Sequence, residues 1–184
     1  MGQPALLVLL AWRLSAAVNP EHRIYLGLGS NIEPVENLSR AIELLTLSVT
    51  IEAMSSVWET PAVGSPGPNY LNLAMEVKSA LAPDELKENV LRKIESQLGR
   101  KRSSDKNAPR TVDIDILIAD DQLIEPALYQ HAYLTVPLAE LIPNFSCQEL
   151  SNETLAQLAR RLSQQIPIKK RTDLNFLTVL KQRS

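Results

Sequence analysis

Two aspartates separated by one residue lie in the most apolar strand-like stretch of the chain. Asp113 and Asp115 belong to residues 111–118, which are otherwise mostly β-branched or aliphatic. Because side chains alternate along a strand, both carboxylates project from the same face. Neighbouring carboxylates in a buried strand repel each other and lose hydration, and a divalent cation between them removes both penalties. The spacing therefore indicates a metal site.

Arginines gather just before this strand. Arg110 is close to it, and Arg100 and Arg102 lie in the basic segment that leads to it. Planar guanidinium groups bind phosphate oxygens well. Carboxylates that bind a cation beside arginines that bind phosphate indicate a site for a nucleotide with Mg²⁺. Taken alone, an Asp-x-Asp pair is more often the solvated face of an edge strand or a partner of nearby arginines, and that alternative stays open.

Composition limits the class of protein. The 184 residues suffice for one domain with a buried core. The net charge is −2 and the pI about 5.8, so we expect neither nucleic acid nor a membrane as a partner. Cys147 is the only cysteine, and His22 and His131 are the only histidines. These counts exclude an internal disulfide, a multi-cysteine zinc site and a histidine-rich metal centre, and they fit a reducing cytoplasm.

The N-terminal residues differ from the rest of the chain. An apolar run from Ala5 to Trp12 is too short to cross a bilayer. No Lys or Arg precedes it, which is unlike a secretory signal. We expect residues 1–22 to be a poorly ordered extension, or the product of a start codon upstream of the true one. A cleaved signal is the alternative left open.

Hydrophobic periodicity in the remaining chain predicts the order β-α-β-β-α-β. Strands are expected over 24–29, 49–59, 70–79 and 111–118, and helices over 34–47 and 83–98. This order is the ferredoxin-like arrangement, an α+β fold with helices on one face of an antiparallel sheet. A helix over 152–165 and a strand over 174–180 follow as added C-terminal elements. We assign residues 23–145 to one domain and 146–184 to a helix and strand extension of it.

Two stretches between these elements carry turn signals. Residues 60–69 are too rich in Pro and Gly for regular structure, and they exceed the length that a hairpin needs. The extra length predicts a functional loop. Pro126, Pro137 and Pro143 are separated by short apolar pieces, to which we assign no helix or strand.

The chain resembles the 6-hydroxymethyl-7,8-dihydropterin pyrophosphokinase family of folate biosynthesis. The family signature is a basic residue, a small residue and Pro-Arg-x-x-Asp-Leu/Ile-Asp, followed by apolar residues, and residues 106–117 match every specified position. Further similarity covers residues 25–31, 59–61, 69–72 and 94–102. Five motifs in the same order and with the right spacing are not expected by chance.

The resemblance implies a reaction and a set of site residues. The reaction is transfer of pyrophosphate from ATP to the hydroxymethyl group of 6-hydroxymethyl-7,8-dihydropterin, with two Mg²⁺ ions and with AMP as leaving group. The implied catalytic residues are Arg100, Arg110, Asp113 and Asp115, of which the aspartates bind the metal. The implied ATP contacts are Glu95, Arg100, Arg102, Arg110 and His131. The implied pterin contacts are Thr60, Pro61, Val63, Tyr70, Asn72 and Tyr133. We expect a cytoplasmic monomer.

The chain departs from the family pattern on the ATP side. The segment after Pro126 is shortened, His131 lies about where the family has a late arginine, and Asn107 replaces a frequent aromatic residue. We therefore expect fewer ATP contacts beside an intact pterin and metal site. Two alternatives stay open: a paralogue that acts on a related hydroxymethylpterin, and a non-catalytic module that binds pterin or nucleotide.

Overall fold

The computed structural model describes residues 21–62, 67–100 and 109–176. These residues form one sheet in which every strand pairing is antiparallel. The strand order is β6-β5-β1-β4-β3-β7, and β2 also pairs with β4. The α+β class predicted from the sequence is confirmed.

The bounds of the elements follow the chain. The strands are β1 (His22–Ser30), β2 (Thr50–Met54), β3 (Trp58–Thr60), β4 (Tyr70–Ser79), β5 (Asp113–Ala119), β6 (Gln122–Leu123) and β7 (Lys169–Lys170). The helical segments are α2 (Pro34–Leu45), α3 (Pro83–Leu86), the π-helical turn η1 (Lys87–Leu91), α4 (Arg92–Gln97), the 3₁₀ turn η2 (Pro126–Tyr129), α5 (Ala132–Leu141) and α6 (Leu155–Leu162).

The predicted order β-α-β-β-α-β is found from β1 to β5, with two differences. The strand expected over 49–59 is two strands, β2 and β3, which both pair with β4. The helix expected over 83–98 comprises α3, η1 and α4, with a π-helical turn in the middle. Pro34 and Pro83 each occupy the first turn of a helix, where a missing N–H costs nothing.

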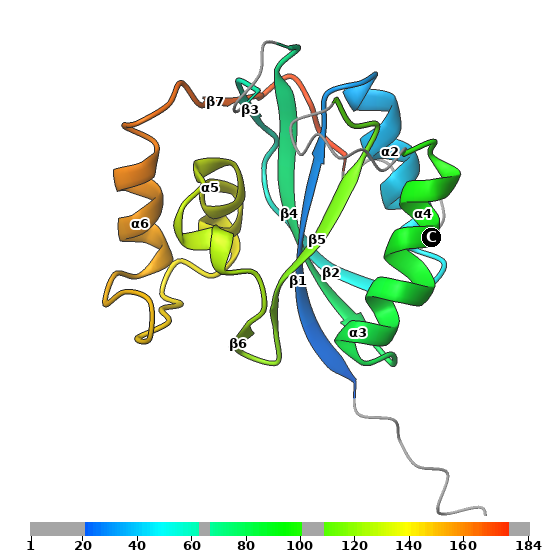
Figure 1. The fold of residues 1–184 in the computed structure, drawn as a ribbon, viewed down its shortest axis with the longest axis horizontal. Coiled ribbons are helices and arrows are strands. Elements are labelled where there is room, and N and C mark those ends of the chain that lie inside the picture. Colours follow the sequence, from blue (N-terminus) through cyan, green and yellow to red (C-terminus); the bar gives the residue numbers. More distant parts are fainter. Residues whose placement is uncertain (1–20, 63–66, 101–108, 177–184) are drawn as a thin grey trace, which may run out of the picture.

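Helices cover both faces of the sheet (Figure 1). α2, α3 and α4 lie on one side, and α5 and α6 lie on the other. The two helices of the predicted β-α-β-β-α-β order, 34–47 and 83–98, thus lie on one face as expected. The other face is covered by the predicted C-terminal helix α6 and by α5, which was not predicted. The central strand β1 is buried from both sides: Ile24, Leu26 and Leu28 join the core under α2 and α4, while Tyr25 joins the core under α5 and α6.

α5 forms in a segment to which the sequence analysis assigned no helix. Pro137 lies inside it and lacks the N–H that would donate to the carbonyl four residues earlier. The helix nevertheless buries most of its side chains against the sheet, and such packing outweighs local propensity. Thr135 Oγ1 also donates to the carbonyl oxygens of Leu128 and His131, the latter at 3.0 Å, and so ties α5 to η2.

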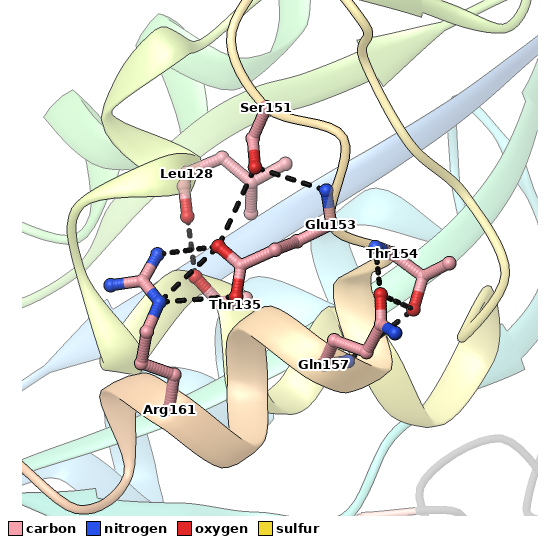
Figure 2. Close-up of polar contacts among 7 residues, drawn as sticks. All are labelled: Leu128, Thr135, Ser151, Glu153, Thr154, Gln157 and Arg161. Carbon is pink, nitrogen blue, oxygen red and sulfur yellow. Dashed lines mark hydrogen bonds and ion pairs between the residues drawn. The ribbon is translucent and has the colours of Figure 1, made fainter.

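α6 begins with a capping box (Figure 2). Thr154 Oγ1 accepts from the N–H of Gln157 at 3.3 Å, and Gln157 Oε1 accepts from the N–H of Thr154 at 2.9 Å. Glu153, just before the cap, accepts from Arg161 Nη2 at 2.8 Å. The predicted helix over 152–165 is thus present but shorter, because the cap fixes its start at Leu155.

The prediction of a strand over 174–180 is wrong for residues 174–176, which form no strand. Residues 177–184 lie outside the described residues. The strand of this region is β7, which pairs with β3. Phe176 is instead buried in the core under α2, with 6% of its surface exposed.

The described chain starts just before β1. Residues 1–20 lie outside the described residues, and β1 begins at His22. None of the helices in the described ranges has the length and apolar character needed to span a membrane.

We predict that Thr154→Ala lowers the free energy of unfolding by about 1 kcal/mol, because it removes the side-chain acceptor of the capping box. Denaturant unfolding followed by circular dichroism measures this change. Gln164→Ala, at an exposed position in the turn after the same helix, serves as the control and should stay within about 0.5 kcal/mol of the parent. Equal effects of the two substitutions would show that the cap contributes nothing.

Candidate functional site

A pocket of about 140 Å³ lies on the face of the sheet that α5 covers. Strand register builds its floor: Asp113 of β5 lies opposite Gly29 of β1, and Gly29 lies opposite Asn72 of β4. Two residues along, Asp115 lies opposite Gly27. The residues that line the pocket are Gly27, Leu28, Gly29, Thr60, Pro61, Tyr70, Asn72, Arg110, Asp113, Asp115, Tyr133 and Leu134.

The two glycines of β1 keep this floor open. A Cβ at Gly29 would lie 3.1 Å from Asn72 Oδ1, and a Cβ at Gly27 would lie 3.1 Å from Leu117 Cδ1. Such distances are tighter than ordinary contact, so a larger residue would have to shift the side chains of Asn72 or Leu117. Glycine therefore lets a flat ligand approach the backbone of β1.

Asp113 is surrounded by positive charge. Its Oδ1 forms an ion pair with Arg100 Nη1, and its Oδ2 forms one with Arg110 Nη1. The Asp113 side chain is 15% exposed, and the two arginine side chains are 19% and 30% exposed. Because the guanidinium groups retain some solvent contact, they can also reach an anionic ligand beside Asp113.

Asp115 has a different environment from Asp113. Burial raises the pKa of Asp115, and the nearby carboxylate of Glu125 raises it further. Arg100 and Arg110 act in the opposite direction, through charge. Burial disfavours the ionised form of Asp115, and a cation bound next to it in the pocket would stabilise that form.

Glu95 lies outside the pocket lining. It is 5% exposed on α4, and its Oε1 accepts from the N–H of Ile114 at 2.9 Å. The same oxygen pairs with Arg100 Nη1. The described contacts of Glu95 are therefore with the start of β5 and with Arg100, which suits a residue that positions the charged cluster.

Asn31 is a further site residue, which was not predicted from the sequence. Its Oδ1 accepts from the N–H of Arg110 at 2.8 Å, and its Nδ2 donates to the carbonyl of Pro68 at 3.3 Å. Asn31 and Ile32 both donate their N–H groups to the carbonyl of Arg110. Asn31 thus fixes the backbone of Arg110. The signal that could have identified it is a polar amide directly after the Gly-x-Gly strand end.

The opposite wall comes from β3 and β4. Asn72 Nδ2 donates to Thr60 Oγ1 at 3.0 Å and to the carbonyl of Trp58 at 3.4 Å. Thr60 is 1% exposed and Asn72 is 4% exposed. Tyr70 lies beside them, and burial raises the pKa of its hydroxyl. A buried hydroxyl and a buried amide side by side can bind the polar edge of a heterocycle.

α5 closes the pocket with an aromatic residue. Tyr133 and Leu134 contribute to the lining. His131, at the N-terminus of α5, stacks on Tyr133 with ring centroids 5.1 Å apart. Burial raises the pKa of Tyr133, and the charge of Asp115 raises it further. Leu134 was not predicted from the sequence, since an aliphatic residue carries no chemical signal of a site.

The fold brings most of the predicted site residues together. The predicted residues on the lining are Thr60, Pro61, Tyr70, Asn72, Arg110, Asp113, Asp115 and Tyr133. Arg100 and His131 contact lining residues without lining the pocket themselves. Val63, Arg102 and Asn107 lie outside the described residues.

The pocket offers a metal ion the two carboxylates of Asp113 and Asp115. Within residues 21–62, 67–100 and 109–176, no group of three or more His, Cys, Asp or Glu side chains is placed to hold a metal ion. Asp113 and Asp115 fit Mg²⁺, which binds proteins through one or two carboxylates and takes its other ligands from water and phosphate. The donor set therefore suits a metal that arrives with a phosphate ligand.

A family model and curated proteins match this chain. The model of 7,8-dihydro-6-hydroxymethylpterin-pyrophosphokinase (HPPK) matches residues 25–143. The 2-amino-4-hydroxy-6-hydroxymethyldihydropteridine pyrophosphokinase of Bacillus subtilis is 38% identical over 141 residues, which are 70% of this chain and 80% of that protein. The Synechocystis protein with the same description is 34% identical over 152 residues, or 77% of this chain and 76% of that protein.

Solved structures show the same fold. A crystal structure of a Plasmodium falciparum HPPK-DHPS variant with pteroate has a TM-score of 0.65 with this chain at 14% sequence identity. The likeness covers 88% of this chain and 46% of that longer one. At this identity it supports the fold alone.

We predict that Glu95→Ala lowers the free energy of unfolding by about 2–4 kcal/mol, because it leaves the N–H of Ile114 and part of the Arg100 charge without their partner. Glu88→Ala is the matched control, since Glu88 pairs with Arg92 on the same helical stretch but is exposed. That control should cost less than about 0.5 kcal/mol. Chemical denaturation measures both, and similar values would contradict the positioning role of Glu95.

Proposed function

The chain belongs to the 7,8-dihydro-6-hydroxymethylpterin-pyrophosphokinase family, and from this premise we propose how its pocket carries the family's reaction. The protein is a pyrophosphokinase of folate biosynthesis, which transfers pyrophosphate from ATP to a hydroxymethyldihydropterin and gives AMP and the pterin diphosphate. One observation carries the assignment of the site: a single pocket joins Asp113 and Asp115 to the Thr60–Asn72 pair.

The pterin is proposed to lie over the glycines of β1. Its polar edge would meet Thr60 and Asn72, whose side chains already form one hydrogen bond and keep further capacity to donate and accept. Its faces would meet Tyr70 and Tyr133. Support comes from the burial of Thr60 and Asn72 and from the open floor at Gly29. Pro61 lines the pocket at the pterin end. Val63, implied by the family resemblance, is a further proposed pterin contact.

The triphosphate of ATP is proposed to lie at the other end of the pocket. Arg100 and Arg110 flank Asp113 there, and both would exchange part of their contact with Asp113 for phosphate oxygens. Arg102 and His131 are further proposed ATP contacts. Glu95 acts in this proposal through Arg100 rather than by touching the nucleotide, because it is buried behind the cluster.

Asp113 and Asp115 would hold Mg²⁺ bound to ATP. Family membership implies a magnesium-dependent enzyme, and we propose two ions for this site. When bound, the metal neutralises the triphosphate and orients it. The protein would contribute by holding the pterin hydroxymethyl group and the β-phosphate close together in the pocket, one wall of which α5 forms with Tyr133 and Leu134.

The fold of the core, the oligomeric state and the cellular location are also proposed. We infer a ferredoxin-like core from β1, α2, β2, β4, α4 and β5, because their order and pairing follow that pattern. We propose a monomer. We also propose a cytoplasmic location, where ATP is supplied.

The buried Asp115 argues against a non-catalytic module, because a pure binder gains nothing from a buried carboxylate.

Full-length protein with ATP, 6-hydroxymethyl-7,8-dihydropterin and Mg²⁺ should release AMP and pterin diphosphate in equal amounts. Excess EDTA should abolish the release, because the carboxylate pair needs its cation. Chromatographic separation of the nucleotides measures the reaction. Release of ADP, or undiminished AMP release in EDTA, would contradict the proposed site.

Asp115→Asn should lower kcat by about a hundredfold or more while the dissociation constant of the pterin changes less than about twofold, because the carboxylate serves the metal rather than the pterin. Steady-state assays and fluorescence titration with the pterin measure the two quantities. Asp121→Asn, in the exposed turn between β5 and β6, is the control and should behave like the parent. Equal losses in turnover and in pterin binding would refute the metal role of Asp115.

A further inference from the structure

The chain beyond α6 returns to the sheet and adds β7 to the outer edge of β3. β7 pairs with β3 at Trp58 and Glu59. The N–H of Arg171, just after β7, donates to the carbonyl of Val57 at 2.9 Å. β3 has only three residues, and its last residue, Thr60, lines the pocket. The C-terminal segment thus converts a very short edge strand into an internal one.

Glu59 connects this segment to both strands of the pocket wall. Its Oε2 lies 3.0 Å from Arg171 Nη1, and its Oε1 accepts from Asn69 Nδ2 at 2.9 Å. Glu59 precedes Thr60 in β3, and Asn69 precedes Tyr70 in β4, and Thr60 and Tyr70 pair across the two strands. One carboxylate therefore holds Arg171 and the ends of both wall strands together.

Arg171 is itself held in place. Its Nε and Nη2 donate to the carboxylate of Asp173 at 2.9 and 2.7 Å. On one side of it, Lys170 Nζ lies 3.0 Å from Glu140 of α5. On the other side, Phe176 is buried in the core under α2. The segment crosses the edge of the sheet between the α6 side and the α2 side (Figure 1) and is anchored at both.

The Arg171–Glu59 contact is partly shielded from solvent. The two side chains are 26% and 24% exposed, so water competes less than it does at a fully exposed ion pair. The hydrogen bond from Asn69, together with Arg171, lowers the pKa of Glu59. Glu59 therefore remains an ionised acceptor for both donors, and charge-assisted bonds of this kind fix direction as well as distance.

We propose that Arg171 is a positioning residue for the pterin-binding wall, which it aligns through Glu59. The proposal rests on the proposed function, in which Thr60 and Asn72 bind the pterin. Asn72 donates to both Thr60 and the carbonyl of Trp58, so any shift of β3 moves the two pterin-reading groups relative to each other. The C-terminal segment thus sets pterin affinity without touching the pterin.

Arg171→Ala should raise the KM for the pterin roughly threefold to tenfold, while kcat and the KM for ATP change less than about twofold, because only the pterin wall loses its alignment. Arg171→Lys keeps the charge opposite Glu59 and should recover part of the effect. Arg161→Ala is the matched control: it removes the partly exposed ion pair between Arg161 of α6 and Glu153 just before that helix (Figure 2), and its pterin KM should equal that of the parent.

A double-mutant cycle tests the route through Glu59. Glu59→Gln alone should raise the pterin KM, and adding Arg171→Ala should raise it little further, because both changes break the same contact. Additive effects would overturn the proposed route. If Arg171→Ala fails to fold, as judged by circular dichroism, Arg171→Lys and Glu59→Gln carry the same test, and a parental pterin KM in both would overturn the proposal.

Asn72→Ala separates this proposal from the one on which it rests. A parental pterin KM in Asn72→Ala would show that the pocket is not the pterin site, and both proposals would fail. A raised pterin KM in Asn72→Ala, with a parental value in folded Arg171→Ala, would overturn the positioning role alone.

Discussion

The antiparallel register of β5, β1 and β4 is the constraint on which the site depends. It places Asp113 opposite Gly29, and Gly29 opposite Asn72, so that a carboxylate, a bare stretch of backbone and an amide form one row on the α5 face. A slip of one residue would turn each of these side chains to the other face and replace them with the aliphatic residues that now form the core under α2. The same alternation of side chains therefore buries the aliphatic residues under α2 and turns Asp113 and Asp115 toward the pocket. A change of register would affect the core and the site together.

Charge is distributed unequally between the two aspartates. Asp113 is compensated by Arg100 and Arg110, and Glu95 in turn holds Arg100 and the backbone of Ile114. No ion pair of this kind compensates Asp115 among the described residues, and burial raises its pKa. The ionised form of Asp115 would be stabilised by a cation bound next to it. Arg100 and Arg110, which pair with Asp113, can still bind an anion. Such an arrangement favours a ligand that brings both charges at once, as a nucleotide triphosphate with magnesium does.

The C-terminal third of the chain contributes residues and support to the pocket. α5 supplies Tyr133 and Leu134 to the lining and buries the second face of the sheet. α6 packs against α5, and the segment after it returns to pair with β3. A three-residue strand that carries Thr60 would be a weak edge without this pairing. The short β3 and the late β7 thus form one structural unit, although more than a hundred positions separate them in the sequence.

The sequence by itself determined the elements whose patterns are local. The alternation in β1 and β4, the prolines that begin α2 and α3, and the Asp113–Asp115 spacing could all be predicted, because strand and helix periodicity need only near neighbours. Motif order identified the family and most residues of the lining. Tertiary structure alone decided that α5 forms across Pro137, that Glu95 supports Arg100 from behind, and that Arg171 reaches Glu59. Each of these depends on burial or contact between distant segments, and such contacts leave no periodic signal in the chain.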